Sequence, residues 1–177
     1  MSGISISIQF DKKLSQLFER AGARSFIAVG RALDEVGGKT RTQVIKATAK
    51  QTGVKQARVR QVIKTKRALG AGAGEYKIIA RDVMLSRKEF APRKTPKGVS
   101  VTTAKRGRIV LAHSWFGPGS HVFVRQGRAR LPVKKLYATA IPNEMVKNEA
   151  EATFYRNVDK LFGAAVEKHL LRALEGK

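Results

Sequence analysis

The chain has 177 residues, no cysteine and a hydrophobic fraction of 42%, which excludes disulfides and thiolate metal sites and argues against global disorder. Its net charge is +23, and residues 39–135 carry most of it, with 25 Lys or Arg against 3 Asp or Glu. A field of this sign attracts polyanions, so the expected partner is nucleic acid, an acidic protein surface or an anionic membrane.

The membrane is the weakest of these three candidates. The first eleven residues lack a basic head followed by an apolar run, so no signal peptide is expected. The longest uncharged run, residues 109–124, is too short to span a bilayer and is interrupted by glycine and proline. The sequence also lacks a clean basic amphipathic helix with an aromatic apolar face, so we expect no membrane contact.

One strand and two helices are predicted near the N-terminus. Alternating isoleucines predict a strand over residues 4–10, and a helix is expected over residues 12–21. Apolar and small side chains then recur at steps of three and four from Phe26 to Ala47, which indicates a second, longer helix. Because a glycine costs about 1 kcal/mol relative to alanine inside a helix, Gly37–Gly38 predicts a bend or a close backbone contact there.

The middle of the chain is predicted to form strands. LGAGAGE (69–75) is typical of a flexible joint, and YKIIARDVML (76–85) favours a strand. FAPRKTPKG (90–98) indicates an exposed loop. Three more strands are expected where apolar runs lie between turn residues: VSVTTA (99–104), RIVLAHSW (108–115) and HVFVRQG (121–127).

The C-terminal region combines an irregular segment with a long helix. RARLPVKKLYATAIP (128–142) is predicted to be irregular, because Pro132 and Pro142 restrict its backbone. Asn143 is a candidate N-cap for a last helix, whose apolar stripe extends to Ala173. A helix of about thirty residues would be roughly 45 Å long, which suits packing against a neighbouring subunit.

These elements predict an α+β fold with N-terminal helices, a small, mostly antiparallel sheet and a long C-terminal helix. We interpret residues 1–177 as a single domain in four parts. Residues 1–68 form a strand and helices with a basic corner, and residues 69–75 form a Gly/Ala joint. Residues 76–142 form a basic sheet, and residues 143–177 form the closing helix.

The residues do not predict catalysis. The basic region contains only Glu75, Asp82 and Glu89 as acids, whereas a two-metal nuclease needs several carboxylates that converge on one site. The three histidines lack metal-ligand spacing. GAGAG (70–74) follows a basic helix instead of a strand and has no acid about twenty residues further on, unlike a dinucleotide-binding fingerprint. We therefore expect no enzymatic activity, no cofactor and no metal site.

TGVKQARVRQVI (52–63) is typical of the turn and second helix of a helix-turn-helix DNA-binding protein. Such a motif needs a small residue in its first helix, a glycine in the turn and apolar residues where the two helices meet. Residues of these kinds stand at the required spacing: Ala49, Gly53, Val54, Val59 and Val62. The side chains that would then face a DNA groove are Lys55, Gln56, Arg60 and Gln61. A DNA-binding protein that uses residues 45–63 is therefore one hypothesis. The alternative is two helices joined at a turn, with cations that are solvated or bind phosphates without reading bases.

An RNA-binding protein is a further hypothesis, because the chain is strongly basic and a small sheet is predicted. A sheet that stacks RNA bases needs exposed aromatic side chains. The candidates do not form a recognisable module in the sequence: Tyr76, Trp115, Phe116 and Phe123.

Three segments in the second half of the chain carry a resemblance to a known family. They are FAPRKTPKGVSV (90–101), GSHVFVRQG (119–127) and LPVKKLYATAIP (131–142). Through them the chain resembles the minor tail protein Z family of tailed bacteriophages, also called tail completion proteins. This likeness covers roughly residues 76–145, and the N-terminal helix, the basic corner and the closing helix agree with the family in order and character.

The resemblance implies a non-enzymatic structural protein of the virion, assembled in the host cytoplasm. Such proteins act at the head-proximal end of a long non-contractile tail, and they are needed for tail maturation, head–tail joining and DNA delivery. The implied partners are the tail terminator, the tail tube, the head–tail connector and further copies of the chain in a six-fold ring. The basic surface would face either double-stranded DNA in the tail lumen or acidic neighbouring proteins.

Two sets of residues are candidates for these contacts. Contact with DNA or an acidic partner is expected from Lys55, Arg58, Arg60, Lys64, Lys66, Arg67, Arg93, Lys94, Lys97, Lys105, Arg106 and Arg108. Contact with another subunit or partner is expected from Phe123, Leu131, Pro132, Leu136, Tyr137, Ile141 and Pro142. The apolar segment 131–142 is equally compatible with a loop that covers the core.

Overall fold

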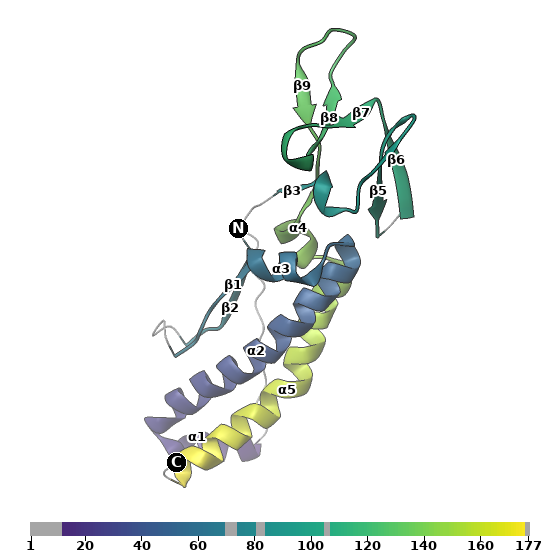
Figure 1. Ribbon diagram of the computed structural model, residues 1–177. Helices are drawn as coiled ribbons and strands as arrows, with labels where there is room; N and C mark the ends of the chain where they lie inside the picture. The colour runs from purple at the N-terminus through teal and green to yellow at the C-terminus, as the bar shows by residue number, and fades with distance from the viewer. Residues whose placement is uncertain (1–11, 70–73, 81–83, 105–106, 176–177) are drawn as a thin grey trace. The chain divides into compact units, whose positions relative to one another are not determined.

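The computed structural model describes residues 12–69, 74–80, 84–104 and 107–175 (Figure 1). The chain divides into two compact units. Unit 1 comprises residues up to 39, residues 66–77 and residues from 156 onward. Unit 2 comprises residues 40–65 and 78–155. The strand predicted over residues 4–10 lies outside the described residues.

The chain is α+β, as the sequence predicts. Its helices are α1 (Lys12–Ala21), α2 (Arg24–Thr52), α3 (Gln56–Val62), α4 (Ile141–Met145) and α5 (Asn148–Leu174), with single 3-10 turns η1 (Arg87–Glu89) and η2 (Pro118–Ser120). Its strands are β1 (Ile63–Lys66), β2 (Lys77–Ala80), β3 (Met84–Ser86), β4 (Arg93–Thr95), β5 (Gly98–Thr103), β6 (Gly107–Ala112), β7 (Ser114–Phe116), β8 (Val122–Arg125), β9 (Val133–Lys135) and β10 (Tyr137–Ala140). None of the described helices is long and apolar enough to cross a membrane.

The strands form several small sheets instead of the single sheet that was predicted. Their orders are β1-β2, β10-β3, β4-β5-β6 and β7-β8-β9. The pairs within the last three sheets are antiparallel. Each sheet has only two or three strands, so its stability depends on packing against other elements.

Unit 1 has a helical core. Small side chains of α2, Ala28 and Ala32, are buried together with Phe162, Val166 and Leu170 of α5. Alanines at this spacing let neighbouring helix backbones approach closely, because they present little side-chain volume on the facing surface. The prediction that the buried apolar stripe of α2 begins at Phe26 is wrong. Phe26 is 60% exposed, and the buried stripe begins two residues later.

Ala68, Leu69 and Tyr76 contact one face of α2. Gly30, Asp34 and Gly37 share that face because they follow one another at steps of four and three. Leu69 contacts α2 at Gly30, and the backbone N–H of Ala68 donates to Oδ1 of Asp34 at 2.7 Å.

The Tyr76 ring occupies the space beside Gly37, where an added Cβ would lie 2.3 Å from the ring carbon Cδ1. Of the two expectations for Gly37–Gly38, the close contact is confirmed. The helix α2 continues through both glycines.

Unit 2 has a mixed core. It is made by the end of α2, by α3, and by inward-facing residues of the strands and α4: Ile45, Ala49, Val54, Val59, Val62, Ile63, Leu85, Phe90, Val99, Val101, Val122 and Ile141. The amide of Gln51 links the elements beside this core. Its Nε2 donates to the side chain and the carbonyl of Glu144, and its Oε1 accepts from the backbone N–H of Ala150.

Three sequence predictions for unit 2 are wrong in detail. The expected loop 90–98 contains strand β4, and the expected irregular segment 128–142 contains β9, β10 and the start of α4. These strands exist through pairing with distant residues, which local sequence does not reveal. Asn143 does not begin the last helix. It lies inside α4, and α5 begins at Asn148, whose φ of +52° separates the two helices.

The two adjacent glycines of α2 provide a matched stability test. In Gly38→Ala an added Cβ meets nothing within 4 Å, so the free energy of unfolding should rise by about 0.5–1 kcal/mol. In Gly37→Ala the new methyl group collides with the Tyr76 ring, so the free energy of unfolding should fall by roughly 1–3 kcal/mol. Urea denaturation measures both. If Gly37→Ala were as stabilising as Gly38→Ala, the Tyr76 contact would not exist in solution.

Candidate polyanion-binding surface

Unit 2 concentrates the positive charge of the chain. It holds 22 Lys or Arg and 5 Asp or Glu, a net charge of +17 out of +23. Residues 90–143 hold 11 Lys or Arg and no acid at all. Strands β4 to β10 are therefore built from a segment whose cations cannot be neutralised by carboxylates of that same segment.

The sheet β4-β5-β6 carries basic side chains on the face opposite its core. Its register pairs Arg93 with Ser100 and Arg108 with Thr102, while Val99 and Val101 point into the core of unit 2. Nε of Arg108 donates to the hydroxyl of Ser100 at 3.0 Å, and that hydroxyl donates to the carbonyl of Arg93 at 3.3 Å. The guanidinium of Arg108 is thus held across the outer face by neutral oxygen atoms.

A groove lies beside this sheet, between the β4–β5 turn and β7. It has a volume of about 610 Å³ and is lined by Lys94, Thr95, Pro96, Lys97, Gly98, Val99, Ala112, His113, Ser114, Trp115 and Phe116. Both lysines are exposed. No Asp or Glu is among the described residues that line it.

Two unusual backbone conformations shape the groove. His113 has a φ of +55°, which is uncommon for a residue with a side chain, and its N–H donates to the carbonyl of Lys97. Gly98 has a φ of +142°, and a Cβ there would lie 2.1 Å from the carbonyl oxygen of Leu111. Only glycine fits that position without moving β6.

The sheet β7-β8-β9 presents aromatic and basic side chains together. The register places Trp115 opposite Phe123, and Phe123 opposite Lys135. The guanidinium of Arg125 lies 5.7 Å from the centre of the Trp115 ring, and Nζ of Lys135 lies 5.3 Å from the centre of the Tyr137 ring. Both distances allow cation–π attraction.

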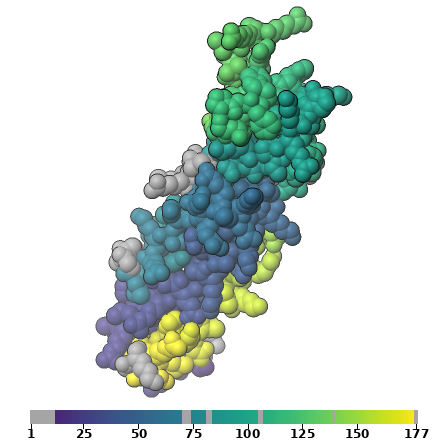
Figure 2. Space-filling view, in the orientation of Figure 1, coloured from purple at the N-terminus to yellow at the C-terminus, as the bar shows by residue number. Residues whose placement is uncertain are grey.

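The hairpin between β8 and β9 extends the basic surface. Figure 2 shows its loop, in pale green, standing clear of the rest of unit 2. Arg125, Arg128, Arg130 and Lys134 are exposed along it. These residues are absent from the sequence-based set of contacts, although the run RQGRAR (125–130) was a visible signal for them.

His121 connects this sheet to β3. Its Nδ1 lies 2.9 Å from the hydroxyl of Ser86, and Nζ of Lys135 lies 3.2 Å from its Nε2. A lysine ammonium can only donate, so Nε2 accepts and the ring is neutral with its proton on Nδ1. Desolvation, together with the charges of Lys135 and Lys88, lowers the pKa of His121 below its ordinary value. The ring therefore adds no charge to the surface at neutral pH.

Residues 45–63 contain two helices joined at a turn, an arrangement that both interpretations of this corner expect. Helix α2 ends at Thr52, Gly53 turns the chain with a φ of +76°, and α3 follows at Gln56–Val62. The residues expected between the helices are buried: Ala49, Val54, Val59 and Val62. Those expected to face outward are exposed: Lys55, Gln56, Arg60 and Gln61. Helix α3 has only seven residues and leads directly into β1.

The cations predicted to contact DNA or an acidic partner are divided between the two units. Lys55, Arg60, Lys64, Arg93, Lys94, Lys97 and Arg108 are exposed in unit 2, whereas Lys66 and Arg67 are exposed in unit 1. Arg58 is half-buried and is already engaged by Glu89, at 3.7 Å, and by Gln61. Lys105 and Arg106 lie outside the described residues.

The predicted interface residues divide between surface and core. Leu131 is 69% exposed, and Pro132 and Tyr137 are also exposed. The half-buried members are Phe123, Leu136 and Pro142. Ile141 is fully buried in the core of unit 2 and offers no surface to a partner.

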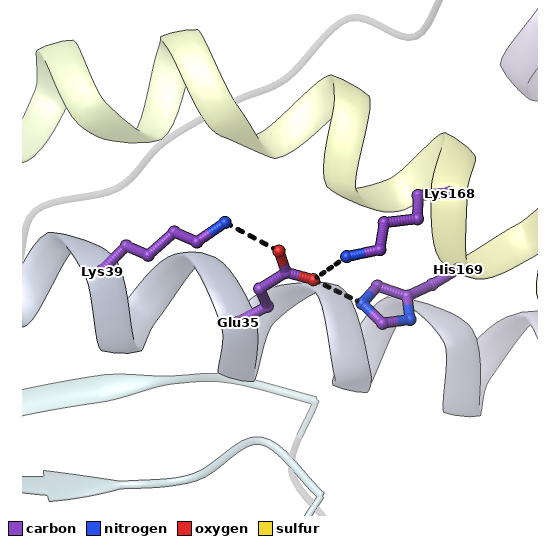
Figure 3. A network of polar contacts seen from close by, with 4 residues as sticks. All are labelled: Glu35, Lys39, Lys168 and His169. Carbon is purple, nitrogen blue, oxygen red and sulfur yellow. Dashed lines mark hydrogen bonds and ion pairs between the residues drawn. The ribbon is translucent and has the colours of Figure 1, made fainter.

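A separate cluster of titratable side chains lies in unit 1 (Figure 3). The Glu35 carboxylate accepts from Nζ of Lys39 at 2.8 Å, from Nζ of Lys168 at 2.9 Å and from Nε2 of His169 at 3.0 Å. Hydrogen bonds from Lys168, Lys39 and His169 lower the pKa of Glu35 to about 2. The cluster ties α2 to α5. Among the described residues, no group of three or more His, Asp or Glu side chains is placed to hold a metal ion.

The Glu35 cluster predicts a specific pH dependence. Because the pKa of Glu35 falls from 4.5 to about 2 on folding, its ionised form stabilises the fold above pH 4.5, and this contribution is lost as the pH falls towards 2. Glu35→Gln should lower the free energy of unfolding at pH 7 by about 1 kcal/mol and have little effect near pH 2. Glu19→Gln, at an exposed position of α1, is the control. Denaturation of both variants at several pH values tests this, and a pH-independent loss would contradict it.

Three comparisons with known proteins find no match to the chain. No family model matches the chain. No curated protein and no solved structure matches it either. The function therefore has to be inferred from the residues of the chain and their geometry.

Proposed function

We propose that the chain is a structural protein of a tailed bacteriophage virion, of the tail completion or minor tail kind. It acts at the head-proximal end of a long non-contractile tail, where it is needed for tail maturation, head–tail joining and DNA delivery. It works by binding and has no enzymatic activity. Its partners are the neighbouring tail and neck proteins, further copies of itself and, at its basic surface, a polyanion.

One observation carries this proposal. The three segments through which the chain resembles tail completion proteins, 90–101, 119–127 and 131–142, all lie in unit 2, within its acid-free stretch 90–143. Segment 90–101 forms β4 and most of β5, 119–127 contains β8, and 131–142 contains β9 and β10. The three segments are separate in sequence, but they therefore belong to one compact unit that is strongly positive.

The charge of unit 2 also restricts how copies of the chain can assemble. Units with a net charge of +17 repel one another unless an anion or an acidic protein screens them. A six-fold ring is compatible with that repulsion when DNA or acidic neighbours supply the opposite charge. Exposed apolar residues near the basic hairpin, Leu131 and Val133, then provide contact area that does not depend on charge.

Deleting the gene from a phage that carries it tests the proposal. Heads and tails should form, but infectious particles should be lost, and mass spectrometry of purified wild-type virions should detect the chain. In complementation, Arg128→Glu/Arg130→Glu should fail, because it places acids on the exposed hairpin. Lys46→Glu/Lys50→Glu changes the charge equally at exposed positions of α2 and should restore infectivity. Absence of the chain from virions, or normal infectivity without it, would overturn the proposal.

A second candidate function is favoured by the corner between α2 and α3. Its exposed Lys55, Gln56, Arg60 and Gln61 fit a DNA-binding protein that reads sequence. This function requires one operator to bind far more tightly than random DNA, and Arg60→Ala should cost about 1–3 kcal/mol at that operator. Binding that is equally weak for all sequences and steeply dependent on salt would exclude it.

A further inference from the structure

The groove between the β4–β5 turn and β7 has the composition of a binding site, not only of a charged surface. Lys94 and Lys97 are exposed on its β4–β5 side, and Trp115 and Phe116 line it from β7. Its volume of about 610 Å³ lies within the range typical of small-ligand sites. Cations alone attract any polyanion, so the aromatic side chains narrow the choice of ligand.

Trp115 is the side chain of this site that can bind a flat group. It is 36% exposed, and the Arg125 guanidinium lies 5.7 Å from its ring centre. A large aromatic ring that stays partly open to solvent beside exposed cations can stack against another flat group. A guanidinium over the ring adds a second planar, positively charged surface to the same stack.

Nucleotides combine the two properties that this groove recognises. Each carries a flat base that stacks on aromatic rings and a phosphate that attracts lysine ammonium groups. A base inside a duplex is already stacked and cannot reach Trp115 unless it is flipped out. An acidic peptide satisfies the lysines but brings no obligatory flat group to the ring.

We propose that this groove binds single-stranded nucleic acid, with backbone phosphates on Lys94 and Lys97 and a base stacked against Trp115. The contacts are independent of base identity, because every base has a face that stacks. The Arg125 guanidinium lies over the same ring, and the exposed hairpin residues Arg128 and Arg130 add further positive charge to unit 2. This site does not depend on the virion role proposed above, and the two can be tested separately.

Trp115 is the only tryptophan of the chain, so its fluorescence reports on the groove directly. The full-length protein is titrated with an oligodeoxythymidylate of about a dozen nucleotides, which fits the usual site size of such proteins. Base stacking should quench the Trp115 emission in a saturable way. A duplex of the same length and polyglutamate should bind more weakly and leave the emission nearly unchanged.

Matched variants then locate the phosphate contacts. Lys94→Ala/Lys97→Ala should weaken binding about tenfold and lower the slope of log affinity against log salt by about 0.7 per lost contact. Lys46→Ala/Lys50→Ala removes the same charge from exposed positions of α2, outside the groove, and should change affinity less than twofold. All four lysines are exposed, so neither double variant disturbs the core.

The aromatic contact is measured with a labelled oligonucleotide by fluorescence anisotropy. Trp115→Ala should weaken binding about tenfold, whereas Phe26→Ala, which removes an exposed aromatic ring in unit 1, should have no effect. Equal losses for the two lysine pairs would show that binding follows net charge alone and would overturn the proposal. Equal affinity for duplex or polyglutamate, or an unchanged Trp115 emission at saturation, would overturn it as well.

Discussion

Strands β4 to β10 of unit 2 have to hold many cations without a carboxylate in their own stretch of sequence. Over residues 90–143 no acid is available, so basic side chains find neutral partners instead. The Arg108 guanidinium bonds to the Ser100 hydroxyl and the Ala91 carbonyl, and Arg125 lies over the Trp115 ring. Carbonyl oxygens and aromatic faces position a cation without cancelling its charge. These two arginines are thus held in place while their positive charge remains available to a partner.

In unit 1, basic side chains pair with a carboxylate. There a single carboxylate, that of Glu35, accepts from two lysines and a histidine and so binds α2 to α5. The core beside it relies on small residues that let helices approach closely, as Ala28 and Ala32 do. Charge in unit 1 stabilises the fold locally, whereas charge in unit 2 is exposed on the surface that the proposed functions use.

Sequence periodicity predicted the helices far better than the strands. The bounds of α1, residues 12–21, agree with the expected helix, and the chain turns at Gly53 between two helices, as expected. These features depend on contacts between residues close in sequence. Strands β4, β9 and β10 were missed because each has only three or four residues and exists through pairing with a partner strand. The break at Asn148 was missed because nothing local distinguishes it from the candidate cap at Asn143.

The candidate surface was predicted only in part, for a related reason. Composition showed that the middle of the chain is basic, but exposure depends on the register of the strands. Ile141 and Leu131 look equivalent in sequence, yet one is in the core and the other is exposed. Arg58 resembles its neighbours in sequence, but the fold brings Glu89 against it. The pairing of Trp115 with Arg125 likewise requires the antiparallel contact of β7 with β8.

The absence of acids from residues 90–143 also has an evolutionary consequence. At the chain's own frequency of 13 acids in 177 residues, about four would be expected in a stretch of this length. An Asp or Glu introduced here would oppose a positive field that no other acid of this stretch weakens. Natural variants of this region should exchange one cation for another, or for a neutral residue, far more freely than they acquire Asp or Glu.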